Sequence, residues 1–368
     1  MGAGEGFTLH PAAMTLKDRG GVCKDKAGML VALLRAAGLE SYPAMTMAGE
    51  RIERIAADQF NHCITVWRKP DGSTVLLDPT WVPGAREMWS SREQQQEVLM
   101  GLPEGADLLT TALSPASDHP LKVAITSRLT GDGTLTGTLV AQADGQSDAA
   151  LRRLYRGRAR TDWAAVDASF LTLTEPRAVV TSVERTDPDD LSKPFTISLR
   201  FSIPSYGRVL ADGALVVVPL AARHPVGIAS RADEMQVSIA PKERAFPMRI
   251  GCTRLVTLSE RLTLPPGVTV TGLPEAKQLD GNGRLWSRWT VSGGELVIDE
   301  RLELTTRIVE PAAWPSLRAA LESFRTLGDT MVLVTPVATA RRGAPGQKSA
   351  GRQAPPKPQP ERPMEVAR

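Results

Sequence analysis

The chain has 368 residues, of which 42% are hydrophobic and 23% charged, as in a soluble globular protein of two or three domains. It contains no apolar run of about 18 residues, so we expect no membrane-spanning helix. The net charge is +3, but residues 341–368 carry seven Lys or Arg against two Glu, which gives this tail +5 and the preceding 340 residues −2. The charge therefore predicts no nucleic-acid partner for the folded part.

The clearest predicted element is a helix over residues 22–38. Apolar residues recur within it at intervals of three and four positions, which is helical spacing. Gly38 stands where a glycine ends many helices, and Gly20-Gly21 allow a sharp turn of the backbone just before the helix.

Short strands are predicted to follow this helix, over residues 42–47, 60–68 and 74–78. Turn residues at 69–72 (Lys-Pro-Asp-Gly) join the last two strands into a β-hairpin. The segment 90–100, with a serine N-cap and several glutamines, favours a second helix. The first domain, residues 1–114, is therefore predicted to be α+β, with a central helix packed on a small antiparallel sheet.

The pattern of the chain changes near residue 115, where residues 114–120 are typical of a linker. Beyond it, residues 120–336 are predicted to form a mainly β, sandwich-like domain with helical breaks near 148–160 and 312–327. Residues 338–368 hold six prolines and almost no large apolar residue, which predicts a disordered basic tail. The strands predicted in the second domain span residues 121–129, 134–142, 177–185, 195–203, 213–219, 233–240, 254–263, 267–272, 283–291 and 295–308, with a turn at Asp132-Gly133.

The chain has three cysteines, Cys23, Cys63 and Cys252. Their odd number and irregular spacing argue against a disulfide framework, and the lack of a CxxC pair argues against a structural zinc site. We expect neither a metal nor an organic cofactor. The first six residues have no basic region followed by an apolar run, so no signal peptide is predicted.

Cys23 lies in the first turn of the predicted helix 22–38. A helix N-terminus carries about half a positive charge, which stabilises a thiolate and lowers the pKa of a thiol. Lys24 and Lys26 add positive potential. A single cysteine is more often an inert packing residue, and that alternative stays open for Cys23 taken alone.

His62 is the candidate base for this thiol, because histidine is the usual partner of a catalytic cysteine. It lies on the predicted strand 60–68, where side chains alternate between the two faces of the sheet. We therefore expect its neighbour Cys63 to point away from the site and to serve in packing. The alternative is a core or edge histidine with a satisfied hydrogen bond.

Asp78 ends the next strand. With the turn centred on Pro70, residues 62 and 78 pair across the hairpin, so the Asp78 carboxylate could accept the imidazole N–H and fix its orientation. Taken alone, Asp78 could be a turn residue before Pro79. Together, Cys23, His62 and Asp78 predict a nucleophile, its base and an orienting carboxylate.

A resemblance to a known family rests on three segments: Arg-Gly-Gly-Val-Cys-Lys-Asp-Lys-Ala at 19–27, Phe-Asn-His at 60–62 and Leu-Asp-Pro-Thr at 77–80. These segments resemble bacterial transglutaminase-like proteins, which are similar in fold to papain-type cysteine hydrolases. The resemblance implies a papain- or transglutaminase-like core followed by a β-rich domain. It also implies the same roles for Cys23, His62 and Asp78.

More narrowly, the chain resembles a bacterial subgroup in which this core is flanked by two poorly characterised β-rich domains. The segment His10-Pro11-Ala12 and residues 120–336 carry this part of the resemblance, whereas Val22 stands where the subgroup often has an acidic residue. The family's core begins upstream of Met1, so the resemblance implies a core that is incomplete at its N-terminus. It also implies a location in the Gram-negative cell envelope or periplasm.

Two functions follow as hypotheses. The first is thiol-dependent acyl transfer on amide or peptide bonds, by hydrolysis or transamidation, through a thioester and with a peptide or protein substrate. The second is a catalytically inactive, transglutaminase-like binding or scaffold protein of the cell envelope. The set of Cys23, His62 and Asp78 favours the first, and the shortened core favours the second. The sequence predicts neither the acyl acceptor nor the oligomeric state.

Overall fold

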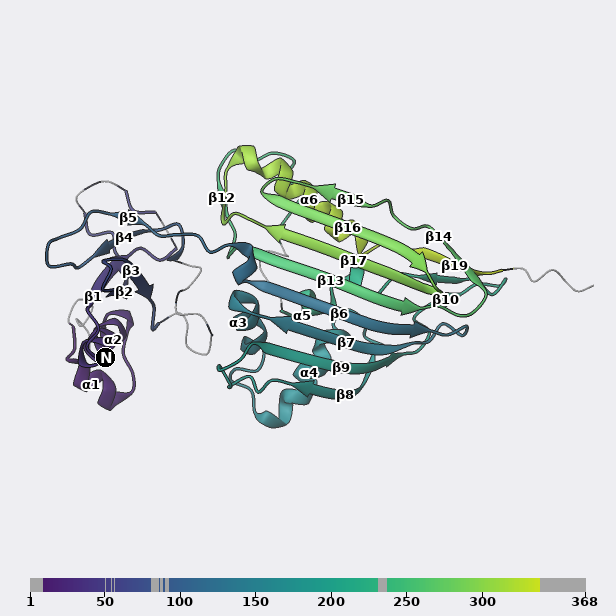
Figure 1. Ribbon diagram of the computed structural model, residues 1–368, viewed down its shortest axis with the longest axis horizontal. Helices are drawn as coiled ribbons and strands as arrows, with labels where there is room; N and C mark the ends of the chain where they lie inside the picture. Colours follow the sequence, from purple (N-terminus) through teal and green to yellow (C-terminus); the bar gives the residue numbers. More distant parts are fainter. Residues whose placement is uncertain are drawn as a thin grey trace, which may run out of the picture. The chain divides into compact units, whose positions relative to one another are not determined.

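The computed structural model describes most of the chain up to residue 337 (Figure 1). The predicted tail, 338–368, lies outside the described residues, as do residues 90–92 of the predicted second helix. The described part up to Pro336 belongs to one compact unit. The described residues are 9–49, 51–53, 55, 57–80, 86, 89, 93–230 and 237–337.

Two helices and a five-stranded sheet form the first region (Figure 1). Helix α1 spans Ala12–Asp18 and helix α2 spans Cys23–Ala36, close to the predicted 22–38. Gly38, just beyond α2, has a φ of +80°, a conformation that glycine adopts without strain. The strands run in the order β3-β2-β1-β4-β5 and span Ser41–Thr46 (β1), His62–Arg68 (β2), Thr74–Leu77 (β3), Glu97–Met100 (β4) and Leu109–Thr110 (β5).

Side-chain hydrogen bonds fix α2 on one face of this sheet. The hydroxyl of Thr65 on β2 donates to the carbonyl oxygen of Ala27 at 3.1 Å, and that of Ser41 on β1 donates to Val31 at 3.1 Å. Strand side chains alternate, so Ile64 and Val66 point to the opposite face, where they form a small apolar core with Ala44 and Val98. The start of α2 is therefore held at a fixed position relative to the start of β2.

The predicted hairpin forms, but its register differs from the prediction. Thr65 pairs with Leu77 and Arg68 with Thr74, so Asp78 lies opposite position 64 rather than opposite His62. Gly72 takes a φ of +82°, and the Lys69 N–H donates to Ser73, which centres the turn on Asp71. This longer turn displaces the pairing by two residues.

The helix predicted over 90–100 was wrong for residues 97–100, which form β4. Val98 pairs with Thr46 of β1 and is fully buried. The side chain of Gln94 is bonded to Ser114, as its Nε2 donates to the Ser114 hydroxyl at 2.8 Å. Burial of Val98 and pairing with a distant strand thus override the helical preference of this polar segment.

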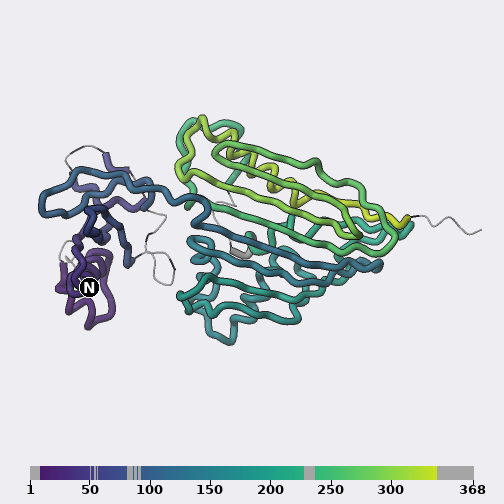
Figure 2. Tube along the Cα trace, viewed as in Figure 1, coloured from purple at the N-terminus to yellow at the C-terminus, as the bar shows by residue number. Residues whose placement is uncertain are grey.

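The second region is built on an eight-stranded sheet in the order β15-β16-β17-β13-β6-β7-β9-β8. Figure 2 shows the distant segments β6 and β13 side by side, and these two strands pair in parallel whereas the other neighbours are antiparallel. The strands span Pro120–Leu129 (β6), Leu135–Ala143 (β7), Val179–Arg185 (β8), Phe195–Ile203 (β9), Arg254–Thr263 (β13), Lys277–Leu279 (β15), Gly283–Ser292 (β16) and Glu295–Leu304 (β17).

Helices and a smaller sheet cover one face of the eight-stranded sheet (Figure 1). Buried and exposed residues alternate along β6 and β16, so the other face of the sheet is exposed. The covering elements are helices α3 (Gly145–Arg153), α4 (Trp163–Thr172), α5 (Pro225–Ser230) and α6 (Trp314–Leu327), and the strands Arg208–Val209 (β10), Leu215–Val217 (β11), Val268–Thr271 (β14) and Val332–Pro336 (β19); Met248–Arg249 (β12) pairs with Ile308–Val309 (β18).

The predicted α+β class with a β-rich second region is confirmed. Sequence reasoning missed α4, and among the residues predicted as a strand over 233–240 the described ones, 237–240, are not in a strand. The described residues contain two separate apolar cores, one in each region. The proposed domain boundaries stay a prediction.

Candidate active site

Cys23 is the first residue of α2, as predicted. Asp25, which is buried, accepts hydrogen bonds from the N–H groups of Val22 at 3.1 Å and His10 at 3.3 Å. Burial opposes ionisation of this carboxyl, but these N–H groups and Lys24 lower its pKa. A Cβ at Gly21 would lie 2.8 Å from the Cβ of Asp25, so only glycine fits there. This local network fixes the start of the helix and the position of Cys23.

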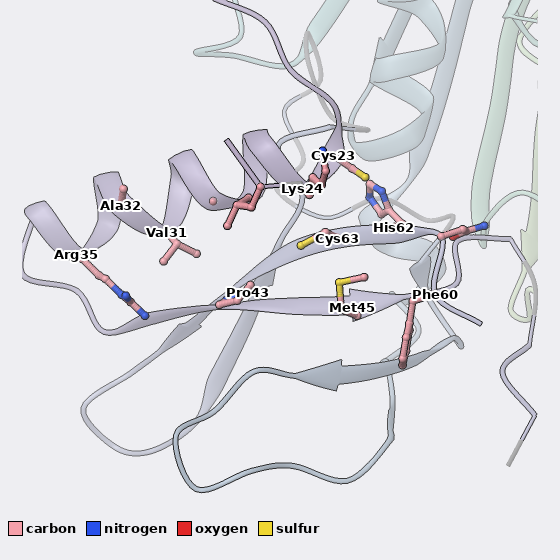
Figure 3. Close-up of a pocket in the computed structure, with 13 residues that line it drawn as sticks. Cys23, Lys24, Val31, Ala32, Arg35, Pro43, Met45, Phe60, His62 and Cys63 are labelled. Atoms are coloured by element: carbon pink, nitrogen blue, oxygen red, sulfur yellow. The ribbon is translucent and has the colours of Figure 1, made fainter. Parts of the chain in front are cut away.

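The side chains of Cys23 and His62 face each other beside the same pocket (Figure 3). Figure 3 shows the sulfur of Cys23 directed at the ring of His62, which begins β2. Contact with His62 lowers the pKa of Cys23, outweighing the opposite effect of burial, with further help from the backbone of Cys63 and Lys24. A thiol with a lowered pKa exists more often as the nucleophilic thiolate.

The carboxylate of Asp78 also contacts the imidazole. Its Oδ2 is 3.3 Å from Nε2 of His62, and its Oδ1 accepts the N–H of Thr80 at 2.7 Å. The two residues are diagonal neighbours on the hairpin, which still allows contact. Asp78 therefore serves as a turn residue after β3, through its bond to Thr80, and also contacts His62. The structure brings together all three predicted residues.

Glu93 is a further member of the site that sequence reasoning missed. Its Oε1 lies 2.8 Å from Nε2 of His62, and the residue is fully buried. Burial raises the pKa of Glu93 to about 7, although the contact with His62 acts in the opposite direction. Burial would lower the pKa of His62, but its contacts with Asp78, Cys23 and Glu93 raise it. The site thus favours an imidazolium beside a thiolate.

Three groups of this site could also hold a metal ion. Nε2 of His62 and one carboxylate oxygen each from Asp78 and Glu93 lie within 4.8 Å of one another. One imidazole and two carboxylates form a donor set that suits Zn²⁺ or a similar divalent ion. A metal bound to Nε2 would replace its hydrogen and would compete with the hydrogen-bonded arrangement.

An apolar pocket of about 810 Å³ opens beside Cys23 and His62. Val31 of α2 and Met45 of β1 contribute to its lining (Figure 3). Cys63 also lines this pocket, because it points toward α2, so the expectation that it faces away from the site was wrong. His62 reaches Cys23 from the first position of β2. Burial raises the pKa of Cys63 to about 11, which fits a packing role.

The comparisons with known proteins found low structural and sequence similarity. No family model and no curated protein matches the chain. A proposed protease from Parabacteroides distasonis is similar in structure, with a TM-score of 0.49 and 13% identity over 89% of this chain and 46% of that one. A zinc metallopeptidase of the M1 group from Deinococcus radiodurans has a TM-score of 0.22 and 9% identity over 59% of this chain and 41% of that one.

The chain spans about half the length of the first of these structures. TM-scores below 0.5 at such identities assign neither a family nor an activity to this chain. None of the described helices combines the length and the apolar character needed to cross a membrane.

Proposed function

We propose that this chain is a transglutaminase-like cysteine hydrolase or acyltransferase that acts on amide or peptide bonds. The observation that carries the proposal is the position of the Cys23 sulfur, at the first residue of α2, directed at the ring of His62 (Figure 3). Contact with His62 lowers the pKa of the Cys23 thiol. The resemblance of residues 19–27, 60–62 and 77–80 to transglutaminase-like proteins supports it.

In the first half of the reaction, the Cys23 thiolate attacks the carbonyl carbon of the substrate and a carbon–sulfur bond forms. The His62 imidazolium then donates its proton to the nitrogen of the leaving group as the carbon–nitrogen bond breaks. Ammonia or an amine departs, and a thioester on Cys23 remains. Nε2 of His62 contacts the carboxylates, so Nδ1 is the ring nitrogen that serves Cys23.

In the second half, neutral His62 takes a proton from water or from an amine as that nucleophile attacks the thioester. The carbon–sulfur bond breaks, Cys23 leaves as thiolate and the imidazolium is restored. Water gives hydrolysis and an amine gives transamidation. The backbone N–H of Cys23 lies at the N-terminus of α2, where it has no acceptor within the helix, and we assign it as a hydrogen-bond donor to the developing oxyanion.

The apolar pocket beside Cys23 favours a substrate that has an apolar group next to the reacting carbonyl. Its walls include Val31, Pro43, Met45 and Phe60. An apolar side chain of a peptide substrate would lose contact with water there, which favours binding. No metal or organic cofactor takes part in the proposed reaction.

Turnover of a peptide pool tests the proposal. The protein is incubated with glutamine-containing and other peptides, with and without a primary amine, and mass spectrometry detects deamidation, cleavage or amine addition. We expect products with the parent protein and with Cys252→Ala, whose cysteine does not line the pocket, and none with Cys23→Ala. Products that persist in Cys23→Ala would contradict the proposal. Absence of any product, with an unreactive Cys23, would favour the binding or scaffold function.

A further inference from the structure

Two carboxylates meet the same ring nitrogen of His62. Oε1 of Glu93 lies 2.8 Å from Nε2, and Oδ2 of Asp78 lies 3.3 Å from it. All three side chains are at most 3% exposed. Oδ2 of Asp78 is hydrogen-bonded to Nε2, whereas Oε1 of Glu93 meets it as an ion pair. The attraction between opposite charges is stronger in a buried environment than in water. The shorter contact belongs to the residue that sequence reasoning did not identify.

The segment that carries Glu93 is anchored by several hydrogen bonds. The hydroxyl of Thr111 donates to the carbonyl oxygen of Glu93. The N–H of Gln96 donates to the Thr111 hydroxyl at 3.0 Å, and the N–H of Gln95 donates to the Thr111 carbonyl oxygen at 3.1 Å. The side-chain amide of Gln94 donates to the Ser114 hydroxyl and accepts the Ser114 N–H. The Glu93 carboxylate is thus presented to His62 from a fixed backbone.

We propose that Glu93 is a positioning residue: paired with Nε2 of His62 as a second carboxylate, beside the hydrogen bond of Asp78, it holds the imidazole against Cys23. The inference rests on the proposed function, since His62 is the base of that reaction. Asp78 is also committed to the turn through Thr80, and Glu93 adds a second, independent support for the ring. The titratable groups that face Glu93 are His62 and Asp78, with Cys23 beyond the imidazole.

The test compares Glu93→Gln with Glu97→Gln in the full chain. Glutamine keeps the size of the side chain and a carbonyl acceptor but removes the charge. Glu97 is a suitable control because it lies on β4 and its carboxylate accepts the N–H of Ile52 instead of contacting His62. Thermal unfolding verifies that both variants are folded.

NMR titration of the His62 ring is the first readout, since it does not depend on thiol chemistry. We expect Glu93→Gln to lower the titration midpoint of His62 by about one pH unit, as the loss of an opposite charge next to the imidazole implies. The midpoint of Cys23 alkylation should rise by about the same amount. Glu97→Gln should change neither value, and Glu93→Asp should restore part of the His62 shift.

Two results would overturn the inference. One is a folded Glu93→Gln variant with the parent's His62 midpoint. The other is a parent protein whose His62 ring signals respond to added Zn²⁺ after chelator treatment, with no response in Glu93→Gln, because Nε2 would then be a metal ligand. A parent in which Cys23 titrates as an ordinary thiol, but Glu93→Gln still shifts His62, would contradict the proposed function and leave the positioning contact supported.

Discussion

Oε1 of Glu93 lies closer to Nε2 of His62, at 2.8 Å, than does Oδ2 of Asp78, at 3.3 Å. The imidazole therefore has two carboxyl groups next to one of its nitrogens, and the Cys23 sulfur is directed at the ring (Figure 3). Two groups that share one partner do not act independently. Removal of either carboxylate leaves the other to hold the ring.

A double-mutant cycle on Asp78→Asn and Glu93→Gln follows from this arrangement. Each single variant should slow alkylation of Cys23 at neutral pH by about tenfold, equivalent to ~1.4 kcal/mol. The double variant should deviate from additivity by at least about 0.5 kcal/mol, because the two residues contact the same atom. Strict additivity of the two effects would show that they do not share His62.

Gly21 and Gly20 form a matched pair at the start of α2. A Cβ at Gly21 would lie 2.8 Å from the Cβ of Asp25, whereas at Gly20 its nearest neighbour would be 3.7 Å away. Gly21→Ala should therefore destabilise the protein by about 1–3 kcal/mol and slow Cys23 alkylation, and Gly20→Ala should do neither. Chemical denaturation measures the difference. Equal stability of the two variants would contradict this account of the helix start.

Glu300 provides a pH-dependent prediction in the β-rich region. Burial raises its pKa to about 7, although the Trp289 indole N–H, which donates to it at 2.9 Å, acts in the opposite direction. A raised carboxyl pKa stabilises the fold below the unfolded value of about 4.5, and this contribution is lost as the pH rises through about 7.

Glu300→Gln should consequently match the parent near pH 5 and be more stable by up to about 3 kcal/mol near pH 8.5. Glu303→Gln is the control on the same strand, since its carboxylate pairs with Arg301 and Arg284. Thermal unfolding at both pH values measures the effect. A Glu300→Gln variant that is less stable than the parent at the higher pH would show that this carboxylate is favourably paired.

Met45 and Leu33 allow a comparison between a pocket position and a surface position. Met45 lines the pocket, whereas Leu33 of α2 is half exposed and does not. Met45→Glu should reduce labelling of Cys23 by a bulky apolar chloromethyl ketone about tenfold and change labelling by iodoacetamide much less, because only the apolar reagent uses the pocket. Leu33→Glu should leave the ratio of the two rates unchanged. A parent-like ratio in Met45→Glu would place reagent binding elsewhere.

The elements that hold Cys23 and His62 could be predicted because their signals are local. Helix α2 shows its period within 14 residues, and β2 is a run of β-branched and aromatic residues. The register of the hairpin was missed by two positions, since it depends on the conformation of Gly72 at the turn. Composition alone does not determine whether a Pro-Asp-Gly turn adds one more residue.

Glu93 and α4 could not be predicted for a different reason. Glu93 reaches His62 because β4 pairs with β1 across more than 50 positions and Thr111 anchors the preceding segment. Such nonlocal pairing leaves no period in the sequence. Helix α4 is apolar on most of its surface, with Phe170 and Leu171 both fully buried, so it lacks the polar face that marks a helix.

The most direct test of the central claim is the alkylation rate of Cys23 by iodoacetamide as a function of pH, in the parent and in His62→Ala. Site-resolved mass spectrometry separates Cys23 from the buried Cys63 and Cys252, which serve as internal references. We expect Cys23 in the parent to react well below the free-thiol pKa of about 8.5, and we expect this reactivity to be lost in His62→Ala. Titration of Cys23 as an ordinary thiol in the parent, or an unchanged profile in His62→Ala, would contradict the account.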